Sequence, residues 1–224
     1  MTTAIENAHA LYMEGIRDGH PREALAKYVG ARYTQHSTGV ADGPEGFLEF
    51  FEPFLKRNPK REIRIVRSFQ DGYYVFVQAY QSLNDGQARW VTMDIFDSDE
   101  HGRIVEHWDV IVPFIEGAVA GETKIVDLDK TEANKETVRA FLRDERRPWS
   151  FVDHASSRGE LRYDYRFKVL GSGNFVASLC RGVIDGKAYA VVDLFRLEAD
   201  RIVEHWGAHE EILPRDQWNN AGKF

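Results

Sequence analysis

The spacing of apolar and polar residues predicts helices in the first quarter of the chain. Apolar residues recur at helical intervals over about Thr3–Arg17, and Pro21–Val29 reads as a short second helix that proline opens. Tyr33–His36 is expected to be a short extended segment. Asp42–Lys56 begins with a helix cap and carries phenylalanines on one broad face, which predicts a third helix that packs on a sheet or roofs a cavity.

From Arg61 the apolar spacing changes to strict alternation, which is typical of strands. Asp71-Gly72 and Asn84–Gly86 are hairpin-turn sequences between the alternating runs. The predicted strands are Ile63–Phe69, Tyr73–Gln81, Arg89–Phe96 and Ile104–Pro113. Helices followed by an antiparallel meander indicate an α+β fold with the helices on one face of a curved sheet.

The closing hairpin of this meander occurs twice in the chain. Arg103–Trp108 returns unchanged as Arg201–Trp206, and an Asp-apolar-Phe strand precedes each copy. A period of about 100 residues is much longer than that of a solenoid repeat, so it indicates two tandem domains. The residue after each copy differs, because Asp109 of the first is Gly207 in the second.

The second copy is expected to be the smaller one. A helix over Thr131–Asp144 is followed by Pro148–Arg158, which replaces the second helix, the short extended segment and the phenylalanine-rich helix. Its strands are predicted at Leu161–Leu170, Asn174–Gly182, Lys187–Phe195 and Arg201–Leu213. Arg215–Phe224 is expected to be a short helix or frayed. The expected bounds are 1–116 for the first domain, 117–130 for a linker and 131–224 for the second domain.

Composition narrows the classes of function. Hydrophobic residues make up 43% and charged residues 29% of the chain, an ordinary globular balance. A net charge of -7 argues against a nucleic-acid partner, because phosphate binding needs clustered lysine and arginine. The single cysteine, Cys180, suits a reducing compartment, and no apolar run is long enough to span a membrane. We therefore expect a soluble, cytoplasmic protein.

Strand alternation places candidate chemistry on one face of the closing hairpin. His107 and Asp109 share a face of the last strand, and Trp90 shares a face with Asp94 on the strand before it. If the two strands pair, Asp94 approaches His107 or Asp109 in mostly apolar surroundings. Burial of that kind destabilises the charged form of a carboxyl, so its pKa is expected to rise toward neutrality, where it can accept and return a proton.

Three motifs in this order resemble one known family. They are YTQH after two helices, DGPEGFLEFF at the entry of the third helix, and DIF…GRIVEHWDV on the closing strands. Together they resemble the SnoaL-like branch of the NTF2-like superfamily. The resemblance covers about Ala4–Ile115 well, and about Asn134–Pro214 only in the strands and the first helix.

The resemblance implies a fold and a chemistry. The fold is a cystatin-like cone, in which helices pack against a strongly bent antiparallel sheet around an apolar pocket. The family's polyketide cyclases close rings by intramolecular aldol chemistry with no metal or organic cofactor. Single-domain relatives dimerise through their sheets, so the tandem is expected to form such a pseudo-dimer within one chain.

The resemblance also assigns roles to residues. The general acid/base of the last strand corresponds to Asp109, and a pocket histidine corresponds to His36. Asp94 stands at the position of a second family histidine, so this chain has a second acid there, which changes the number of protons that the site can hold. The second copy lacks the acid and any clear equivalent of His36, with His154 as a remnant at most, so it is expected to be inactive.

These considerations give a set of candidate residues. Asp109, His36 and His107 are the catalytic candidates. The substrate-binding candidates are Asp94, Trp90, Tyr33, Gln35, Phe51, Phe54 and Tyr80. His107 and Asp94 recur in the copy without the acid, so a structural role competes with a catalytic one for both. The spacing of His36, Asp94, His107 and Asp109 matches no compact metal-binding motif. Neither a metal nor a cofactor is expected.

Two hypotheses follow for the function. In the first, Asp109 moves a proton next to a carbonyl of a small hydrophobic molecule, as in an aldol-type cyclase or an isomerase, and His36 or His107 orients the acid or polarises the oxygen. In the second, the same pocket is a non-catalytic binding module. The partner in either case is a small hydrophobic molecule, not a nucleic acid or a membrane, and a further homodimer is left open.

Overall fold

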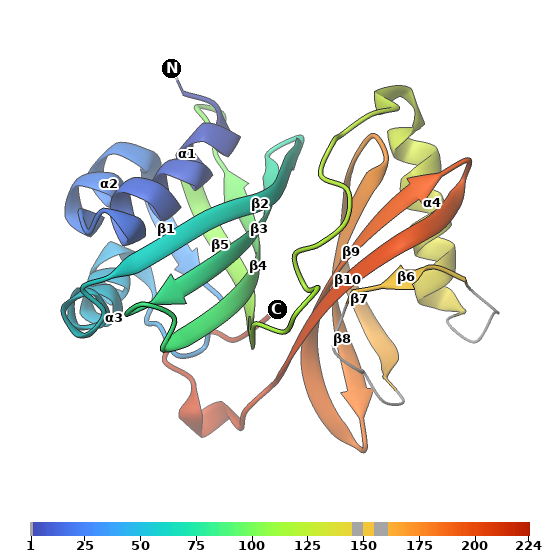
Figure 1. Ribbon diagram of the computed structural model, residues 1–224. Coiled ribbons are helices and arrows are strands. Elements are labelled where there is room, and N and C mark those ends of the chain that lie inside the picture. Colours follow the sequence, from blue (N-terminus) through green and yellow to red (C-terminus); the bar gives the residue numbers. More distant parts are fainter. Residues whose placement is uncertain (1, 145–149, 155–160) are drawn as a thin grey trace. The chain divides into compact units, whose positions relative to one another are not determined.

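The computed structural model describes residues 2–144, 150–154 and 161–224 and divides into two compact units. The first unit comprises Met1–Asp109 together with Leu213–Phe224, and the second comprises Val110–Ile212 (Figure 1). We call Leu213–Phe224 the strap. The strap follows the last strand of the second copy in sequence and was expected in the second domain, yet it packs on the first unit.

Helices form the first part of the first unit, as the apolar spacing predicts. Thr3 caps the first helix through a capping box with Glu6, and Pro21 occupies the first turn of the next. The first helix continues into a π-helical turn rather than remaining regular to its end. The elements are α1 (Ala4–Ala10), the π-helix η1 (Leu11–Arg17), α2 (Pro21–Tyr28) and α3 (Gly43–Arg57).

A five-stranded sheet completes the first unit. Its strands are β1 (Val29–Gln35), β2 (Arg61–Asp71), β3 (Tyr74–Leu83), β4 (Ala88–Ser98) and β5 (Ile104–Pro113), in the order β1-β5-β4-β3-β2. The strands β2, β3 and β4 are antiparallel neighbours, whereas β1 runs parallel to β5. Figure 1 shows the helices on one face of this sheet.

The core lies between the helices and that face. Val75, Val77 and Ala79 alternate along β3 into a cluster with Ala8 and Leu11 of the helices. The intervening residues of β3 therefore point to the opposite face of the sheet. This alternation decides which predicted side chains can meet the acids.

The second unit repeats the sheet with fewer helices. Its elements are the 3-10 turn η2 (Leu128–Lys130), α4 (Thr131–Arg143), β6 (Val152–Asp153), β7 (Arg162–Ser172), β8 (Phe175–Ile184), β9 (Lys187–Glu198) and β10 (Arg201–Glu211). The strand order is β6-β10-β9-β8-β7, and β6 runs parallel to β10 as β1 does to β5. Two α+β copies are therefore confirmed.

One feature of the second copy differs from the expectation. Pro148–Arg158 was expected to replace the short extended segment, but β6 occupies the place of that segment in the sheet. Residues 148–149 and 155–158 of this stretch lie outside the described residues. No helix in the described ranges is long and apolar enough to cross a membrane.

Candidate active site

A buried network of polar side chains lies between the helices and the sheet of the first unit. The Nε2 atom of His107 lies 2.8 Å from Oδ1 of Asp94. The phenol of Tyr12, from η1, donates to Oδ2 of Asp94 at 2.7 Å and lies 2.8 Å from the Thr92 hydroxyl. The Phe96 ring stacks on the imidazole of His107 with centroids 4.6 Å apart. The predicted approach of Asp94 to His107 is confirmed.

The amide oxygen of Gln35 determines which ring nitrogen of His107 carries a proton. This oxygen accepts hydrogen bonds from the backbone N–H groups of His36 and Ser37 and lies 2.9 Å from Nδ1 of His107. An oxygen in that position can only accept, so Nδ1 carries a proton. The opposite nitrogen, Nε2, is then the atom that faces the Asp94 carboxyl.

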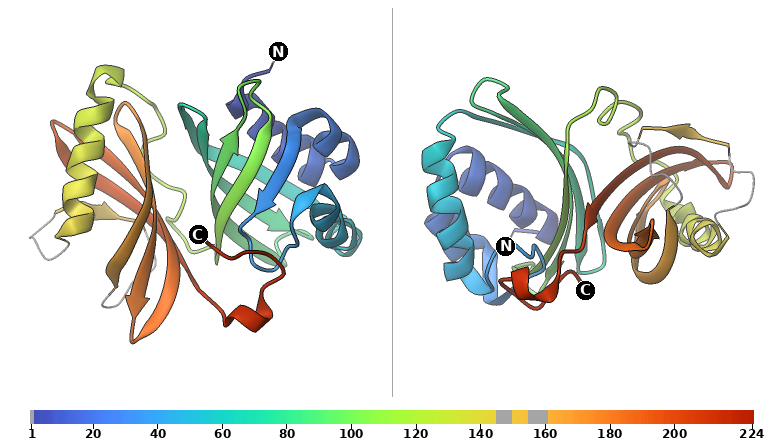
Figure 2. Two further views of the ribbon diagram at one scale, coloured as in Figure 1. Left: turned by 180° about the vertical axis from the view of Figure 1, so that it is seen from behind. Right: turned by 90° about the horizontal axis from the view of Figure 1, so that it is seen from below.

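Asp109 lies on β5, two residues beyond His107, and has a different partner. The Lys223 ammonium of the strap donates to the backbone oxygen of Asp109 at 3.0 Å and to its Oδ1 at 3.1 Å. Both residues are buried, with exposed fractions of 6% for Asp109 and 3% for Lys223. Figure 2 shows the end of the strap beside the first sheet.

The Lys223 ammonium overturns one expectation. Burial raises the pKa of Asp109, but the nearby charges of Lys223 and His107, with hydrogen bonds from Lys223 and Ser37, outweigh burial and hold the pKa below its ordinary value. The expected rise is found at Asp94 instead. Burial there is the largest effect and outweighs the hydrogen bond from His107, so the pKa of Asp94 is raised.

Tyr33 belongs to the same buried region. Burial raises the pKa of its phenol, and the negative charges of Asp109 and Asp94 raise it further. Burial and Asp94 act on the phenol of Tyr12 in the same direction. Both phenols therefore stay protonated beside the carboxylates, and that of Tyr12 donates to Asp94.

His36, in contrast, lies on the other face of β5. Its Nε2 atom is 2.8 Å from Oε1 of Glu106, its Nδ1 atom is 2.6 Å from the backbone oxygen of Gly222, and its ring stacks on Trp108 at 4.6 Å. The His36 N–H bonds to the His107 carbonyl, which continues the parallel ladder and turns the His36 side chain away from that of Gln35. The structure does not bring His36 to Asp109.

The remaining predicted residues divide by the same alternation. Phe51 and Phe54 of α3 pack against the core on the helix side of the sheet. Trp90 alternates on β4 with Asp94 and is partly buried. Tyr80 lies on the face of β3 opposite the core, where the Arg64 guanidinium lies 5.6 Å from its ring centroid, so the structure does not bring it to the acids.

The second unit reproduces most of this network. His205 Nε2 lies 2.8 Å from Oδ1 of Asp193, and Tyr163 donates to Oδ2 of the same carboxylate at 2.7 Å. Oδ1 of Asp153 lies 2.8 Å from His205 Nδ1, in the place that Gln35 takes in the first unit. The histidine–carboxylate pair is thus common to both copies.

The histidine on the other face also recurs. His154 stacks on Trp206 with ring planes 7° apart, and its Nε2 atom lies 3.1 Å from Oε1 of Glu204. His154 is therefore the structural equivalent of His36, contrary to the expectation that the second copy has no clear one. Because it recurs beside Gly207, this arrangement of histidine, tryptophan and glutamate is shared framework.

The acid position separates the two copies. A Cβ atom built on Gly207 would lie 2.9 Å from Asp193 Oδ1 and 2.9 Å from His205 Cε1. Real Cβ atoms essentially never come this close, so the second copy has no room for a side chain there.

Two residues of the network were missed in the sequence. Tyr12 was taken as part of an apolar helix face, and Lys223 as part of a frayed end. A signal for Lys223 exists, because Ala221-Gly222-Lys223 repeats Ala120-Gly121-Glu122 at the same distance after Pro214 and Pro113. No comparable signal pairs Tyr12 with Asp94.

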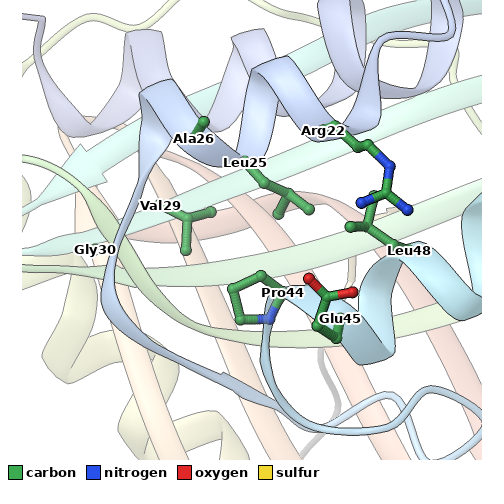
Figure 3. Close-up of a pocket in the computed structure, with 8 residues that line it drawn as sticks. All are labelled: Arg22, Leu25, Ala26, Val29, Gly30, Pro44, Glu45 and Leu48. Atoms are coloured by element: carbon green, nitrogen blue, oxygen red, sulfur yellow. The ribbon is translucent and has the colours of Figure 1, made fainter.

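A crevice of about 380 Å³ lies elsewhere in the first unit, between α2, β1 and α3 (Figure 3). Its lining residues are Arg22, Leu25, Ala26, Val29, Gly30, Pro44, Glu45 and Leu48. None of the predicted site residues lines it. Within the described ranges, no group of three or more histidine, cysteine or acidic side chains could hold a metal ion.

Comparison with known proteins finds a family model that matches part of the first unit. A family model described as a SnoaL-like domain matches residues 10–107. Curated proteins give no match.

Solved structures similar to this chain include wild-type IdmH from Streptomyces antibioticus, at 18% identity, with 49% of this chain and 92% of that chain covered and a TM-score of 0.41. A protein named for its likeness to SnoaL polyketide cyclases, from Jannaschia sp. CCS1, has 20% identity over 48% of this chain and 84% of its own, with a TM-score of 0.41. An LEH-like epoxide hydrolase from M. tuberculosis has 19% identity over 49% of this chain and 82% of its own, with a TM-score of 0.40.

Proposed function

We propose that the first unit, whose residues 10–107 match the SnoaL-like family model, is a cofactor-independent enzyme. Its substrate is a small hydrophobic carbonyl compound. Asp109 is the general acid/base, and the reaction is an aldol-type cyclisation or an isomerisation.

The observation that supports this proposal is the difference between the two copies. Both keep the histidine–carboxylate pair and the histidine on the other face, so these groups serve the fold in each. Asp109 has only a glycine, Gly207, as its counterpart, and its carboxylate is buried. A buried acid that the fold does not require is a candidate for chemistry.

The reaction step assigned to Asp109 is a proton transfer. The carboxylate takes a proton from the carbon next to the substrate carbonyl, and the electrons of that C–H bond move to the carbonyl oxygen as an enolate. The enolate carbon then attacks a second carbonyl, or takes the proton back at another carbon. Asp109 returns the proton in either case.

The lowered pKa of Asp109 limits the substrate class. A weakly basic carboxylate removes a proton efficiently only from an acidified carbon. The proposal therefore favours carbon flanked by two carbonyls, or a ketone whose enolate the site stabilises. Metal ions and organic cofactors have no part in this scheme.

A non-catalytic binding module remains the second candidate, and the ion pair between Asp109 and Lys223 favours it. A carboxylate that a buried ammonium already neutralises is suited to holding a ligand as well as to moving a proton. The two candidates differ in whether bound carbonyl compounds exchange protons with solvent.

Hydrogen–deuterium exchange at carbon separates the two candidates. β-Tetralone and benzoylacetone are incubated with the full chain in D2O at neutral pD, and loss of the α-proton signals is followed by NMR against a protein-free blank. The enzyme proposal expects catalysed exchange that Asp109→Asn lowers by about 10²–10⁴-fold. Binding of both ketones without catalysed exchange would favour the binding module.

A further inference from the structure

The strap is bound to the first unit by side-chain and backbone hydrogen bonds on both faces of β5. The Asn219 N–H bonds to the Thr38 carbonyl, and the Asn220 side-chain amide donates to the carbonyls of Ser37 and Val40. Gly222 then places its carbonyl oxygen 2.6 Å from Nδ1 of His36. These contacts fix the backbone immediately before Lys223.

Gly222 is required for this course. Its φ of +108° lies in a region that side chains rarely adopt, and a Cβ atom there would lie 2.3 Å from the Trp218 ring. Trp218 is itself held by a hydrogen bond from its indole to the Leu213 carbonyl. The turn at Gly222 therefore directs Lys223 into the buried region where it meets Asp109.

The second unit has the matching segment without the cation. Gly121, also at positive φ, packs against Glu204, Trp206 and His154. The indole of Trp206 donates to the carbonyl oxygen of Ala120 at 2.9 Å. The next residue, Glu122, bonds to the two backbone N–H groups that follow it and is exposed. Lysine thus occurs in the segment that covers Asp109, and glutamate in the segment that covers the copy with glycine.

We propose that Lys223 is the electrophilic catalytic residue of the first unit, and that its ammonium stabilises the oxyanion formed when Asp109 removes a proton from a carbonyl substrate. This inference rests on the proposed function. The substrate carbonyl oxygen takes up the hydrogen bond that Lys223 now gives to the Asp109 side chain.

The charges balance in this step. Before it, the site holds the Asp109 carboxylate and the Lys223 ammonium. The C–H bond breaks, its proton bonds to Asp109, and its electron pair becomes the enolate whose oxygen faces Lys223. The site therefore holds one negative and one positive charge both before and after the transfer, so no charge is left unpaired in a buried region.

The test measures two quantities on the full chain. One is the α-proton exchange of β-tetralone, and the other is the titration of the Asp109 carboxyl carbon by NMR. Lys223→Met and Lys223→Gln remove the cation, and Lys223→Arg keeps it. Lys135→Met is the matched control, because Lys135 is another buried lysine, paired with Glu132 in the second unit.

The neutral variants are expected to lose about 10²–10³-fold in exchange rate, as is found when an oxyanion donor is removed. In the same variants the Asp109 midpoint is expected to rise above the ordinary 3.8, because burial then acts without the Lys223 charge, whereas a carboxyl exposed by unfolding would titrate at the ordinary value. Lys223→Arg should recover part of the exchange, and Lys135→Met should leave it unchanged.

Three outcomes would contradict the inference, and they can be told apart. If Asp109→Asn loses exchange while both neutral Lys223 variants keep it, Lys223 is only structural and the proposed function stands. If Lys223→Arg loses as much as Lys223→Met, charge is not what the strap supplies. If the unaltered chain shows no exchange above the blank, the proposed function fails and the inference fails with it.

Discussion

Asp94 and Asp109 lie in one buried region, yet their pKa values move in opposite directions. Burial raises the pKa of Asp94 despite the hydrogen bonds from His107 and Tyr12, whereas the charges and hydrogen bonds around Asp109, with Lys223 foremost, outweigh burial there. NMR titration of labelled carboxyl carbons should therefore find the midpoint of Asp109 below the 3.8 of an ordinary aspartate. The midpoint of Asp94 should lie above 3.8. Asp109→Asn and Asp94→Asn identify the two signals, and the reverse order would contradict the assigned ion pair.

The same pKa shifts determine how the stability of the first unit depends on pH. The stabilisation from Asp109 is fully present above the pKa of the unfolded chain and is lost as pH falls through the lowered folded pKa. Asp94 acts the other way, because the folded unit binds its proton more tightly, so its contribution falls as pH rises through the raised pKa. In Asp109→Asn, the stability of the first unit should therefore fall less steeply as the pH is lowered. Amide hydrogen exchange of β5 measures this stability.

In the second copy, the side chains of Asp193 and His205 occupy the space next to Gly207, where the first copy has the Asp109 side chain. Gly207→Ala should destabilise the second unit by about 1–3 kcal/mol, as overpacking does, because the added Cβ meets the carboxylate of Asp193 and the ring of His205. Gly39→Ala is the comparison, since nothing lies within 4 Å of a Cβ there. Equal effects in hydrogen exchange of the two units would show that the site has room.

At the scale of elements, the two copies reach the same arrangement by different routes. The phenol that bonds the buried aspartate comes from the π-helical turn η1 in the first unit and from strand β7 in the second. Tyr12→Phe and Tyr163→Phe each remove one donor from a buried carboxylate, which costs about 1–3 kcal/mol. Each variant should increase hydrogen exchange only in its own unit, and an effect in both units would contradict independent networks.

The sequence predicts those features that depend on neighbouring residues. Strand alternation and the turn at Asp71-Gly72 are local, so the meander and the contact of Asp94 with His107 followed from them. The contact of Tyr12 with Asp94 joins residues 82 positions apart, and that of Lys223 with Asp109 joins residues 114 apart. No local pattern encodes such pairs. Because the contact with Lys223 was not foreseen, the pKa of Asp109 was expected to rise, whereas it is lowered.

At the scale of the whole chain, the segments after the two closing strands are exchanged between the units. The segment after β5 supplies Ala120 and Gly121 to the second unit, and the strap after β10 supplies Gly222 and Lys223 to the first. Each unit is therefore completed by a segment that follows the closing strand of the other copy. The sheet-to-sheet pseudo-dimer stays a prediction, whereas this exchange is a property of the connectivity.

The exchange of segments predicts an effect that sequence order alone would assign to the wrong unit. A chain that stops after Ile212 lacks the strap, so Asp109 loses Lys223 and His36 loses the Gly222 carbonyl. Removing one partner of a buried ion pair costs about 3–5 kcal/mol. Amide hydrogen exchange should therefore rise in the first unit and stay unchanged in the adjoining β10.

A shorter deletion, of residues 223–224 alone, separates the ion pair from the other strap contacts. It should produce the part of the destabilisation that is due to Lys223, because Asn219, Asn220 and Gly222 still bind. If either deletion loosened β10 and β9 and left β5 protected, the strap would belong energetically to the second unit. The assignment of Lys223 to the acid of the first unit would then fail, because a lysine can neutralise Asp109 only while the strap is bound to that unit.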